Sequence, residues 1–279
     1  MPEPGIYVVD AFCDAPFTGN PAAVCMMFEP RGADWMQNLA AEMNLSETAF
    51  IWPSSEQFFN LRWFTPTVEV DLCGHATLAS AKAILQAGIC DPEKPIVFHT
   101  RSGELTAISD KADPDFIWLD FPTKFCEPVH LPSGLLQSLH IPVEAVRYIG
   151  RNQFDYLLEV ADESIVRGLV PDFNSMMQVK ARGLIVTAQA DPMNTKRYDF
   201  VSRFFAPQSG INEDPVTGSA HCALAPFWGD RLQRNELTGY QASKRGGFVR
   251  VLRQADRVKL GGRAMIITEG TLSKAAWGV

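Results

Sequence analysis

The stretch that most constrains this chain is one that it carries twice. Residues 61–81 read LRWFTPTVEVDLCGHATLASA, and residues 202–225 read SRFFAPQSGINEDPVTGSAHCALA. Each copy runs from an Arg through two aromatic residues and a Pro to a Gly that opens a run of small apolar residues. A repeat at such a long spacing predicts two related structural halves.

Further matches at a fixed offset support this duplication. Arg62 and Arg203 lie 141 residues apart (203 − 62), whereas Gly74 and Gly218 lie 144 apart (218 − 74), so the second copy has a longer loop between these anchors. The offset of 144 persists downstream, where TRSGELTAI, starting at Thr100, faces KRGGFVRVL. We therefore predict two homologous halves, residues 1–125 and 126–279, with the final strand packing on either half. The length agrees with about two domains of roughly 100–150 residues.

The apolar periodicity gives each half many strands and one especially apolar helix. In the first half we expect strands in 5–12, 47–52, 59–64, 95–100, 103–108 and 116–122, a turn around 17–24, and helices over 33–43 and 74–88. A second apolar helix begins at Gly218. A helix that is apolar on nearly all sides must be buried, so we expect the sheet of each half to wrap around it. The predicted fold class is α+β.

Charge and composition exclude several classes of partner. The net charge is −7 and the Lys and Arg residues are scattered, which argues against nucleic acid and an anionic membrane as main partners. The chain lacks an apolar run of the ~18 residues that a membrane span needs. The first residues do not form a signal peptide, so we expect a cytoplasmic protein with six reduced cysteines. These cysteines show no zinc-finger spacing, and the nucleotide-binding fingerprints are absent.

The repeated Gly turn suggests an anion-binding site. In each copy the Gly, Gly74 or Gly218, begins a helix whose first N–H groups have no partner within the helix and carry partial positive charge. A backbone without large side chains lets an anion approach these groups. Two such turns in homologous positions, facing each other across a cleft, predict a clamp for a carboxylate-bearing small molecule. The alternative is that both are simply capped central helices.

The side chains at the two turns differ in their chemistry. Cys73 and His75 flank the first Gly, and Thr217 and Ser219 flank the second. A Cys just before a helix has its thiolate favoured and can act as an acid or base, although a packing role is equally consistent with the sequence. Thr217 does not ionise in that range, so a symmetric two-thiol racemase is incomplete here. The helix dipole is expected to hold His75 neutral, with a solvated cap as the alternative.

A further acid–base group is expected near the start of the strand at 47–52. We expect Asn44 to end the preceding helix and Glu47 to enter a strand of mostly apolar residues. Such surroundings disfavour the charged carboxylate and raise its pKa toward the range useful for general acid–base catalysis. The alternative is a Glu that faces water or pairs with Arg62. Asp214, four residues before Gly218, either accepts a hydrogen bond from a substrate or stabilises its own turn.

Several long motifs then resemble the phenazine biosynthesis-like (PhzF-like) family of the diaminopimelate epimerase-fold superfamily. They are DAFCDAPFTGNPAAV, MNLSETAFI, RWFTPTVEVDLCGHATLASA, TRSGEL and FFAPQSGINEDPVTGSAHCAL, spread over nearly the whole chain. The resemblance implies two halves, each a barrel-like sheet around a central helix, with the active site in the cleft between them. It also implies a homodimer that works without metal or organic cofactor.

The same resemblance assigns roles to particular residues. It places the acid–base glutamate of the family on Glu47 and its helpers on His75, Asp214 and Ser219. The loop at Asn20 resembles the part that lines the cleft, and the backbone at Gly74, Thr217 and Gly218 would bind the substrate. Related epimerases have a cysteine before each helix Gly, but only Cys73 remains here.

The sequence therefore predicts an isomerase in which Glu47 moves a proton between carbons of a small carboxylate. Two alternatives stay open at this point. One is a racemase or epimerase that uses Cys73 with Glu47, and the other is a non-catalytic binding or scaffold protein on the same fold. The substrate itself does not follow from the fold.

Overall fold

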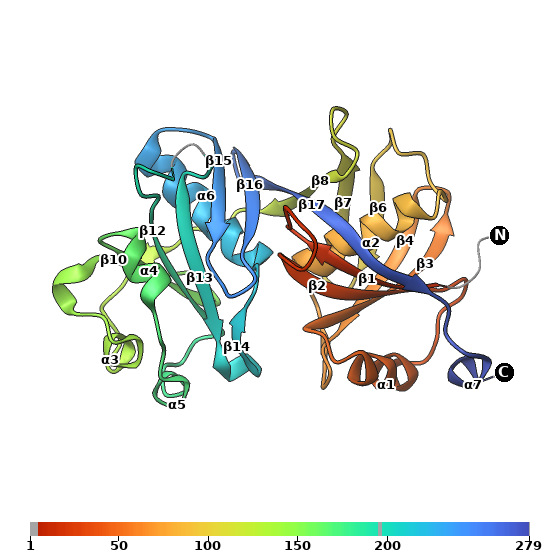
Figure 1. Ribbon diagram of the computed structural model, residues 1–279, viewed down its shortest axis with the longest axis horizontal. Coiled ribbons are helices and arrows are strands. Elements are labelled where there is room, and N and C mark those ends of the chain that lie inside the picture. The colour runs from red at the N-terminus through yellow and green to blue at the C-terminus, as the bar shows by residue number, and fades with distance from the viewer. Residues whose placement is uncertain (1–4, 195–196, 279) are drawn as a thin grey trace. The chain divides into compact units, whose positions relative to one another are not determined.

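The computed structural model describes residues 5–194 and 197–278 (Figure 1). Contacts divide the chain into two compact units, Met1–Phe121 with Gly261–Val279 and Pro122–Leu260. The boundary predicted at residue 125 separates the two copies of the duplicated sequence, whereas this division follows contacts. The predicted boundary therefore stays a prediction. None of the helices within the described ranges is both long and apolar enough to span a membrane.

The first unit contains a closed barrel of eight strands. These are β1 (Gly5–Ala11), β2 (Asn20–Met26), β3 (Glu47–Ser55), β4 (Phe58–Phe64), β6 (Ile96–Thr100), β7 (Gly103–Ser109), β8 (Phe116–Pro122) and β17 (Arg257–Gly270). They pair in that order and β17 returns to β1, while the short β5 (Glu69–Val70) pairs with β4. The β2–β3 and β4–β6 pairs are parallel, so each needs a crossover connection, and a helix lies in each one.

Helix α2 (Gly74–Gln86) is the central helix of this unit and contacts β1, β2, β3 and β7 (Figure 1). Most of its residues are buried, as the apolar sequence predicted. Two of its buried polar side chains bond within the helix, because Thr77 and Ser80 donate to the carbonyls of Cys73 and Ala76 at 2.6 and 2.7 Å.

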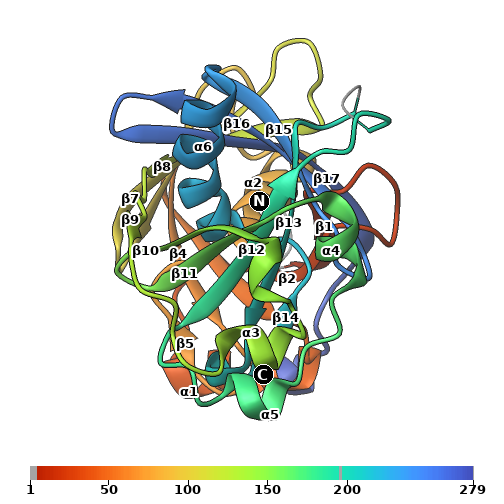
Figure 2. The ribbon, with the colours of Figure 1, turned by 90° about the vertical axis from the view of Figure 1, so that its left-hand side faces the viewer.

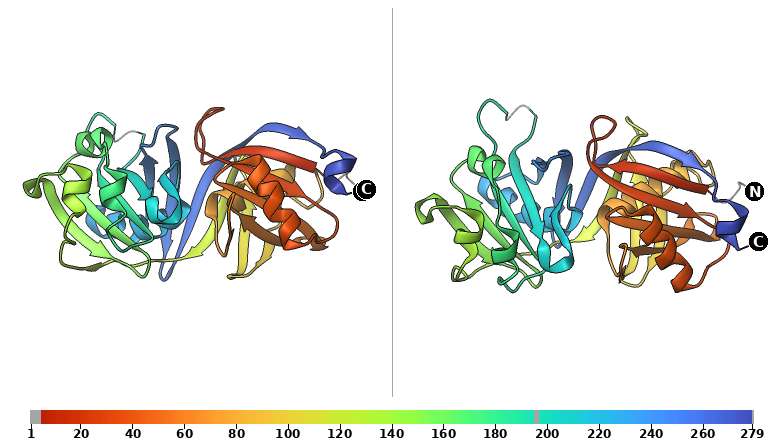
Figure 3. Two further views of the ribbon diagram at one scale, coloured as in Figure 1. Left: turned by 90° about the horizontal axis from the view of Figure 1, so that it is seen from below. Right: turned by 60° about the horizontal axis from the view of Figure 1, so that its bottom comes forward.

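Helix α1 (Ala33–Met43) lies on the outer side of the barrel against β3 and β4 (Figure 3). Its bounds are those predicted from the sequence. Met36 and Ala40 form its buried ridge, and Asn44 ends it in the left-handed conformation at φ 50°. The C-terminal helix α7 (Lys274–Trp277) covers its start, because Trp277 stacks on Trp35 at a centroid distance of 5.2 Å.

The second unit repeats this plan, with α6 as its central helix (Figure 2). Its strands are β9 (Glu127–Pro128), β10 (Val146–Arg151), β11 (Asp155–Val160), β12 (Gly183–Gln189), β13 (Phe200–Ala206), β14 (Ile211–Asp214), β15 (Glu236–Gln241) and β16 (Gly247–Gln254). Its helices are α3 (Leu135–Leu139), α4 (Glu163–Gly168), α5 (Phe173–Met176) and α6 (Gly218–Leu232), with single 3₁₀ turns at Val143–Ala145 and Pro207–Ser209. The β11–β12 and β13–β15 pairs are parallel, as β2–β3 and β4–β6 are in the first unit.

The duplication extends to individual contacts. Arg62 on β4 makes a bidentate ion pair with Glu69, and Arg203 on β13 makes the same pair with Glu213. The three extra residues of the second copy lie between Arg203 and Glu213. The two glutamates, Glu69 and Glu213, are therefore already 144 residues apart (213 − 69). The structure thus confirms the α+β class and the barrel-like sheet around a central helix in each half.

Two local features show how the second unit accommodates breaks in the pattern. Pro226 lies inside α6 and has no N–H for the carbonyl of Cys222, and the backbone N–H of Lys124 donates to that carbonyl instead at 3.0 Å.

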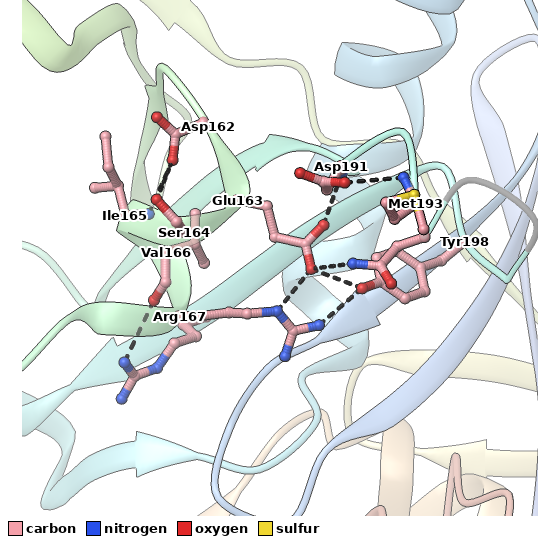
Figure 4. A network of polar contacts seen from close by, with 11 residues as sticks. Asp162, Glu163, Ser164, Ile165, Val166, Arg167, Asp191, Met193 and Tyr198 are labelled. Carbon is pink, nitrogen blue, oxygen red and sulfur yellow. Dashed lines mark hydrogen bonds and ion pairs between the residues drawn. The ribbon is translucent and has the colours of Figure 1, made fainter.

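Buried Glu163, at the start of α4, anchors that helix to the segment between β12 and β13 (Figure 4).

The Glu163 carboxylate is fully used by this anchoring. It accepts from the Arg167 guanidinium, the Asn194 amide, the Tyr198 hydroxyl and the backbone N–H of Asp191 at 2.6–3.0 Å. Burial alone raises the pKa of Glu163, but these hydrogen bonds outweigh it and the net pKa is lowered. The network is therefore structural, with three of its donors on Oε1 and one on Oε2.

One sequence prediction is wrong in the first unit, at the connection between β1 and β2. The turn expected around 17–24 ends at Gly19, and Asn20–Met26 form the buried strand β2. Because β2 is covered on both faces, its residues are almost continuously apolar and do not alternate, so the strand signal is weak. Gly19 has φ +71° and makes the tight entry that delivers Asn20 to the barrel.

Candidate active site

Glu47 and His75 meet at one end of the first barrel. Glu47 is the first residue of β3, and His75 is the second residue of α2. The His75 Nε2 lies 3.2 Å from Glu47 Oε2, and the two side chains are only 4% and 13% exposed. Arg62 pairs with Glu69 and not with Glu47, so the predicted alternative of a Glu47–Arg62 pair is wrong.

His75 is held neutral. Burial lowers its pKa to about 3, because the charged imidazolium would lose its hydration. The sequence also predicted a neutral ring, but attributed it to the helix dipole. The structure assigns desolvation as the main cause.

Asn20 fixes which ring nitrogen of His75 carries the proton. The Asn20 Nδ2 lies 3.1 Å from His75 Nδ1, and an amide nitrogen only donates. Nδ1 therefore accepts, and in the neutral ring the hydrogen resides on Nε2, the atom that faces Glu47. The site thus presents an N–H to the carboxylate without a full positive charge.

Cys73 completes this cluster. It is the buried N-cap residue of α2, and its Sγ lies 3.5 Å from His75 Nδ1. The two roles that the sequence left open for Cys73, packing and acid–base catalysis, both stay predictions. The donor atoms of Glu47, Cys73 and His75 lie within 4.8 Å of one another, so these three side chains also have the spacing to hold a metal ion.

In the second unit, Thr217 and Asp214 form the corresponding turn. The Thr217 hydroxyl donates to Asp214 Oδ2 at 2.5 Å, which is the turn-stabilising role considered for Asp214. The buried side chain of Gln241 accepts from Thr217 N–H at 2.9 Å and donates to the Asp214 carbonyl at 2.6 Å. Gln241 therefore fixes this turn from the neighbouring strand β15.

Ser219 is the second residue of α6, directly after Gly218. It holds the same place as His75 on α2, because both follow the helix Gly and lie 144 residues apart (219 − 75). Its hydroxyl accepts from Arg182 Nη2 at 3.1 Å, and Arg182 in turn pairs with buried Asp155.

The structure thus gathers Glu47, His75, Cys73 and Asn20 at the start of α2 in the first unit. It gathers Asp214, Thr217 and Ser219 at the start of α6 in the second. Gln241, Arg182 and Asp155 were not predicted. Gln241 contacts Thr217 across 24 residues of sequence and Arg182 contacts Ser219 across 37, while Asp155 contacts Arg182 across 27, and no local motif marks these residues.

Comparisons with known proteins agree with this architecture. A sequence model of the family described as phenazine biosynthesis-like protein matches residues 9–270. An uncharacterized isomerase of Halalkalibacterium halodurans is 48% identical, with 96% of this chain and 97% of the relative covered. An uncharacterized isomerase of Pseudomonas aeruginosa is 44% identical, with 96% and 98% covered.

A solved structure shows the same fold. The crystal structure of a phenazine biosynthesis protein of the PhzF family from Enterococcus faecalis superposes with a TM-score of 0.87 at 38% sequence identity. The match covers 96% of this chain and 98% of that one.

Proposed function

This chain belongs to the phenazine biosynthesis-like family and is an isomerase, and we propose that Glu47 is its general acid–base. In this proposal the Glu47 carboxylate removes a proton from an activated C–H of a small carboxylate-bearing metabolite. The carboxylic acid so formed returns the proton to another carbon of the same molecule. Atoms and charge balance without a co-reactant, as an isomerisation requires.

The observation that carries this proposal is the contact between Glu47 and a neutral His75. A carboxylate beside an imidazolium would be stabilised as an ion and made a weaker base. Nε2 of the neutral ring lies 3.2 Å from Glu47 Oε2 and carries no full positive charge, so the carboxylate keeps its capacity to take a proton. Asn20 maintains that arrangement by donating to Nδ1.

A second route uses the thiol. Cys73 Sγ lies 3.5 Å from His75 Nδ1, and an epimerase or racemase would result if Cys73 removed the proton from one face of the carbon and Glu47 returned one to the opposite face. This route requires the two groups to move apart, because their donor atoms lie within 4.8 Å of each other. The two routes differ in the product, since the first relocates a proton between carbons and the second inverts one carbon.

Proton exchange in D₂O distinguishes these routes. The protein is incubated with a panel of cyclic and acyclic amino and hydroxy acids, including dihydro-hydroxyanthranilate, and NMR and mass spectrometry follow deuterium incorporation and isomer formation. Glu47→Gln is expected to lower the rate by about 10²–10⁴-fold, the usual contribution of a general acid–base. Exposed Glu56→Gln is the control and should retain the rate.

Exchange that survives in Glu47→Gln and disappears in Cys73→Ala would transfer the role to the thiol. Exchange that survives in both variants would refute a proton-transfer role for this cluster. The homodimer and the absence of a cofactor rest on the family resemblance alone. Sedimentation analysis, and assay of protein treated with a chelator, test them separately.

A further inference from the structure

The duplicated topology places two polar triads at equivalent positions. In the first unit, Asn20 opens β2, Glu47 opens β3 and His75 is the second residue of α2. In the second unit, Asp155 opens β11, Arg182 directly precedes β12, and Ser219 is the second residue of α6. Strands β2 and β3 are a parallel pair, as are β11 and β12.

The chemistry of the two triads is different. The first triad contains a carboxylate and an imidazole, groups that proteins use in general acid–base catalysis, whereas a guanidinium stays protonated and a serine hydroxyl stays neutral throughout the range in which proteins work. In the second triad the one carboxylate, Asp155, is paired with Arg182, so the groups this triad offers are a guanidinium and a serine hydroxyl.

The Arg182 guanidinium is held in one position. Its Nε donates to Asp155 Oδ1 at 2.9 Å, its Nη2 pairs with Oδ2 of the same buried carboxylate, and its plane lies over the Phe154 ring at 5.2 Å. The backbone N–H of Arg182 donates to the Phe154 carbonyl at 3.0 Å. Both the main chain and the side chain are thus fixed before any ligand arrives.

This position of Arg182 determines how the Ser219 hydroxyl points. A guanidinium has no acceptor, so in the 3.1 Å contact the Ser219 oxygen must accept. The single hydroxyl hydrogen of Ser219 is then directed away from Arg182 and remains available to donate. An oriented O–H beside the backbone N–H groups that begin α6 is suited to a carboxylate oxygen.

We propose that Arg182 is a positioning and specificity-determining residue that makes Ser219 a hydrogen-bond donor for the carboxylate of the substrate. This inference rests on the proposed function for the substrate class. It adds to that function a recognition role for the second triad, which would hold the carboxylate of the substrate.

Paired probes that differ only in charge test this proposal. Benzoate and its neutral isostere benzamide are titrated into the full-length protein, and NMR follows the backbone amides of Gly218 and Ser219. The wild-type protein is expected to bind benzoate at least about 10-fold more tightly than benzamide, in line with a charge-assisted hydrogen bond. Arg182→Gln and Ser219→Ala should each remove most of that preference.

A double variant separates positioning from a general structural role. If Arg182 acts through Ser219, adding Arg182→Gln to Ser219→Ala has little further effect on the preference. The matched control is Arg231→Gln, which breaks a bidentate pair with Glu159 of similar exposure in the same unit and should keep the preference. Ser219→Ala leaves the Arg182–Asp155 pair intact, so this variant still tests the proposal even if Arg182→Gln does not fold.

Three results would overturn the proposal: no benzoate preference in the wild-type protein, a preference unchanged in Arg182→Gln, or additive effects of the two substitutions. Glu47→Gln distinguishes this outcome from failure of the proposed function. Glu47→Gln should stop proton exchange and leave the benzoate preference intact. Proton exchange thus tests the role of Glu47, and the benzoate preference tests the role of Arg182.

Discussion

At the scale of single residues, the hydrogen bond from Asn20 to His75 determines what Glu47 faces. Because the Asn20 amide donates to Nδ1, the hydrogen of the neutral ring is on Nε2, 3.2 Å from the carboxylate. An acceptor at position 20 would reverse this arrangement and turn an Nε2 lone pair toward the carboxylate. The identity of one buried amide thus decides whether Glu47 and His75 attract or repel each other.

Asn20→Asp tests this dependence with a nearly isosteric change. The new carboxylate accepts from Nδ1, so the ring hydrogen is expected to move from Nε2 to Nδ1, and turnover should fall by at least about 100-fold. Nitrogen-15 NMR of the His75 ring reports the tautomer, and D₂O exchange reports the rate. A rate close to that of wild type, together with the tautomer moved to Nδ1, would mean that the Nε2–H is not needed.

At the scale of elements, each central helix contains one buried neutral histidine. His75 on α2 and His221 on α6 have their pKa lowered by burial, from the ordinary 6.5 to about 3 and about 4. The His221 Nδ1 donates to the Thr217 carbonyl at 2.8 Å, and Thr77 makes the equivalent bond to Cys73 on α2. In both helices a side chain thus adds a second hydrogen bond to the N-cap carbonyl, which also accepts from the backbone N–H of the same residue.

These two histidines give stability a defined pH dependence. Because the folded-state pKa is depressed, their contribution is fully present above pH 6.5 and is lost as the pH falls toward 4, where only the unfolded chain takes up protons. Below pH 6.5, each histidine is expected to lower the free energy of unfolding by about 1 kcal/mol for each further unit of pH. Urea unfolding at several pH values between 7 and 4.5 measures this slope.

Substitution identifies the source of that slope. His75→Gln and His221→Gln should each flatten the decline, whereas exposed His140→Gln should leave it unchanged. An identical slope in all three variants would assign the acid sensitivity to carboxylates instead.

The loop between β1 and β2 has its own requirement, set by Gly19. At φ +71°, a Cβ on this residue would lie 2.3 Å from the carbonyl oxygen of Ala11. Gly19→Ala is therefore expected to cost more than about 1 kcal/mol of stability and to displace Asn20, which lowers turnover as well. Gly270→Ala, where a Cβ meets open space, is the matched control. Equal melting temperatures for the two variants would show that the loop relaxes without cost.

Elements with strong local signals were predictable, and those specified by tertiary pairing were not. The bounds of α1 and the start of α2 follow from apolar periodicity and from Asn44 and Gly74, residues that act within one turn. Strand β2 was missed because a strand buried on both faces does not alternate. The contact between Arg182 and Ser219 was missed because it joins residues 37 apart.

At the scale of the whole molecule, the first barrel depends on the last part of the chain. Strand β17 pairs with β1 and with β8, so the barrel closes only when residues beyond Gly261 return to it. By sequence, β17 belongs to the second half of the duplication, but by contacts most of it belongs to the first unit. The sequence analysis left both placements open for this strand. Without it, β1 and β8 would each expose an unpaired main-chain edge.

Truncation tests how far folding of the first unit relies on that strand. A chain that ends at Leu260 lacks the segment that pairs with β1 and is expected to leave the first unit protease-sensitive, with exposed apolar surface that binds a fluorescent dye such as ANS. A chain that ends at Gly270 keeps β17 and loses only α7, so it should stay folded with a lower melting temperature, because the stacking of Trp277 on Trp35 is gone. Limited proteolysis with mass spectrometry locates the cleavage sites. If the chain ending at Leu260 is cleaved no faster between residues 5 and 121 than the chain ending at Gly270, the remaining strands form a stable sheet without closure, and the barrel is not a condition for folding.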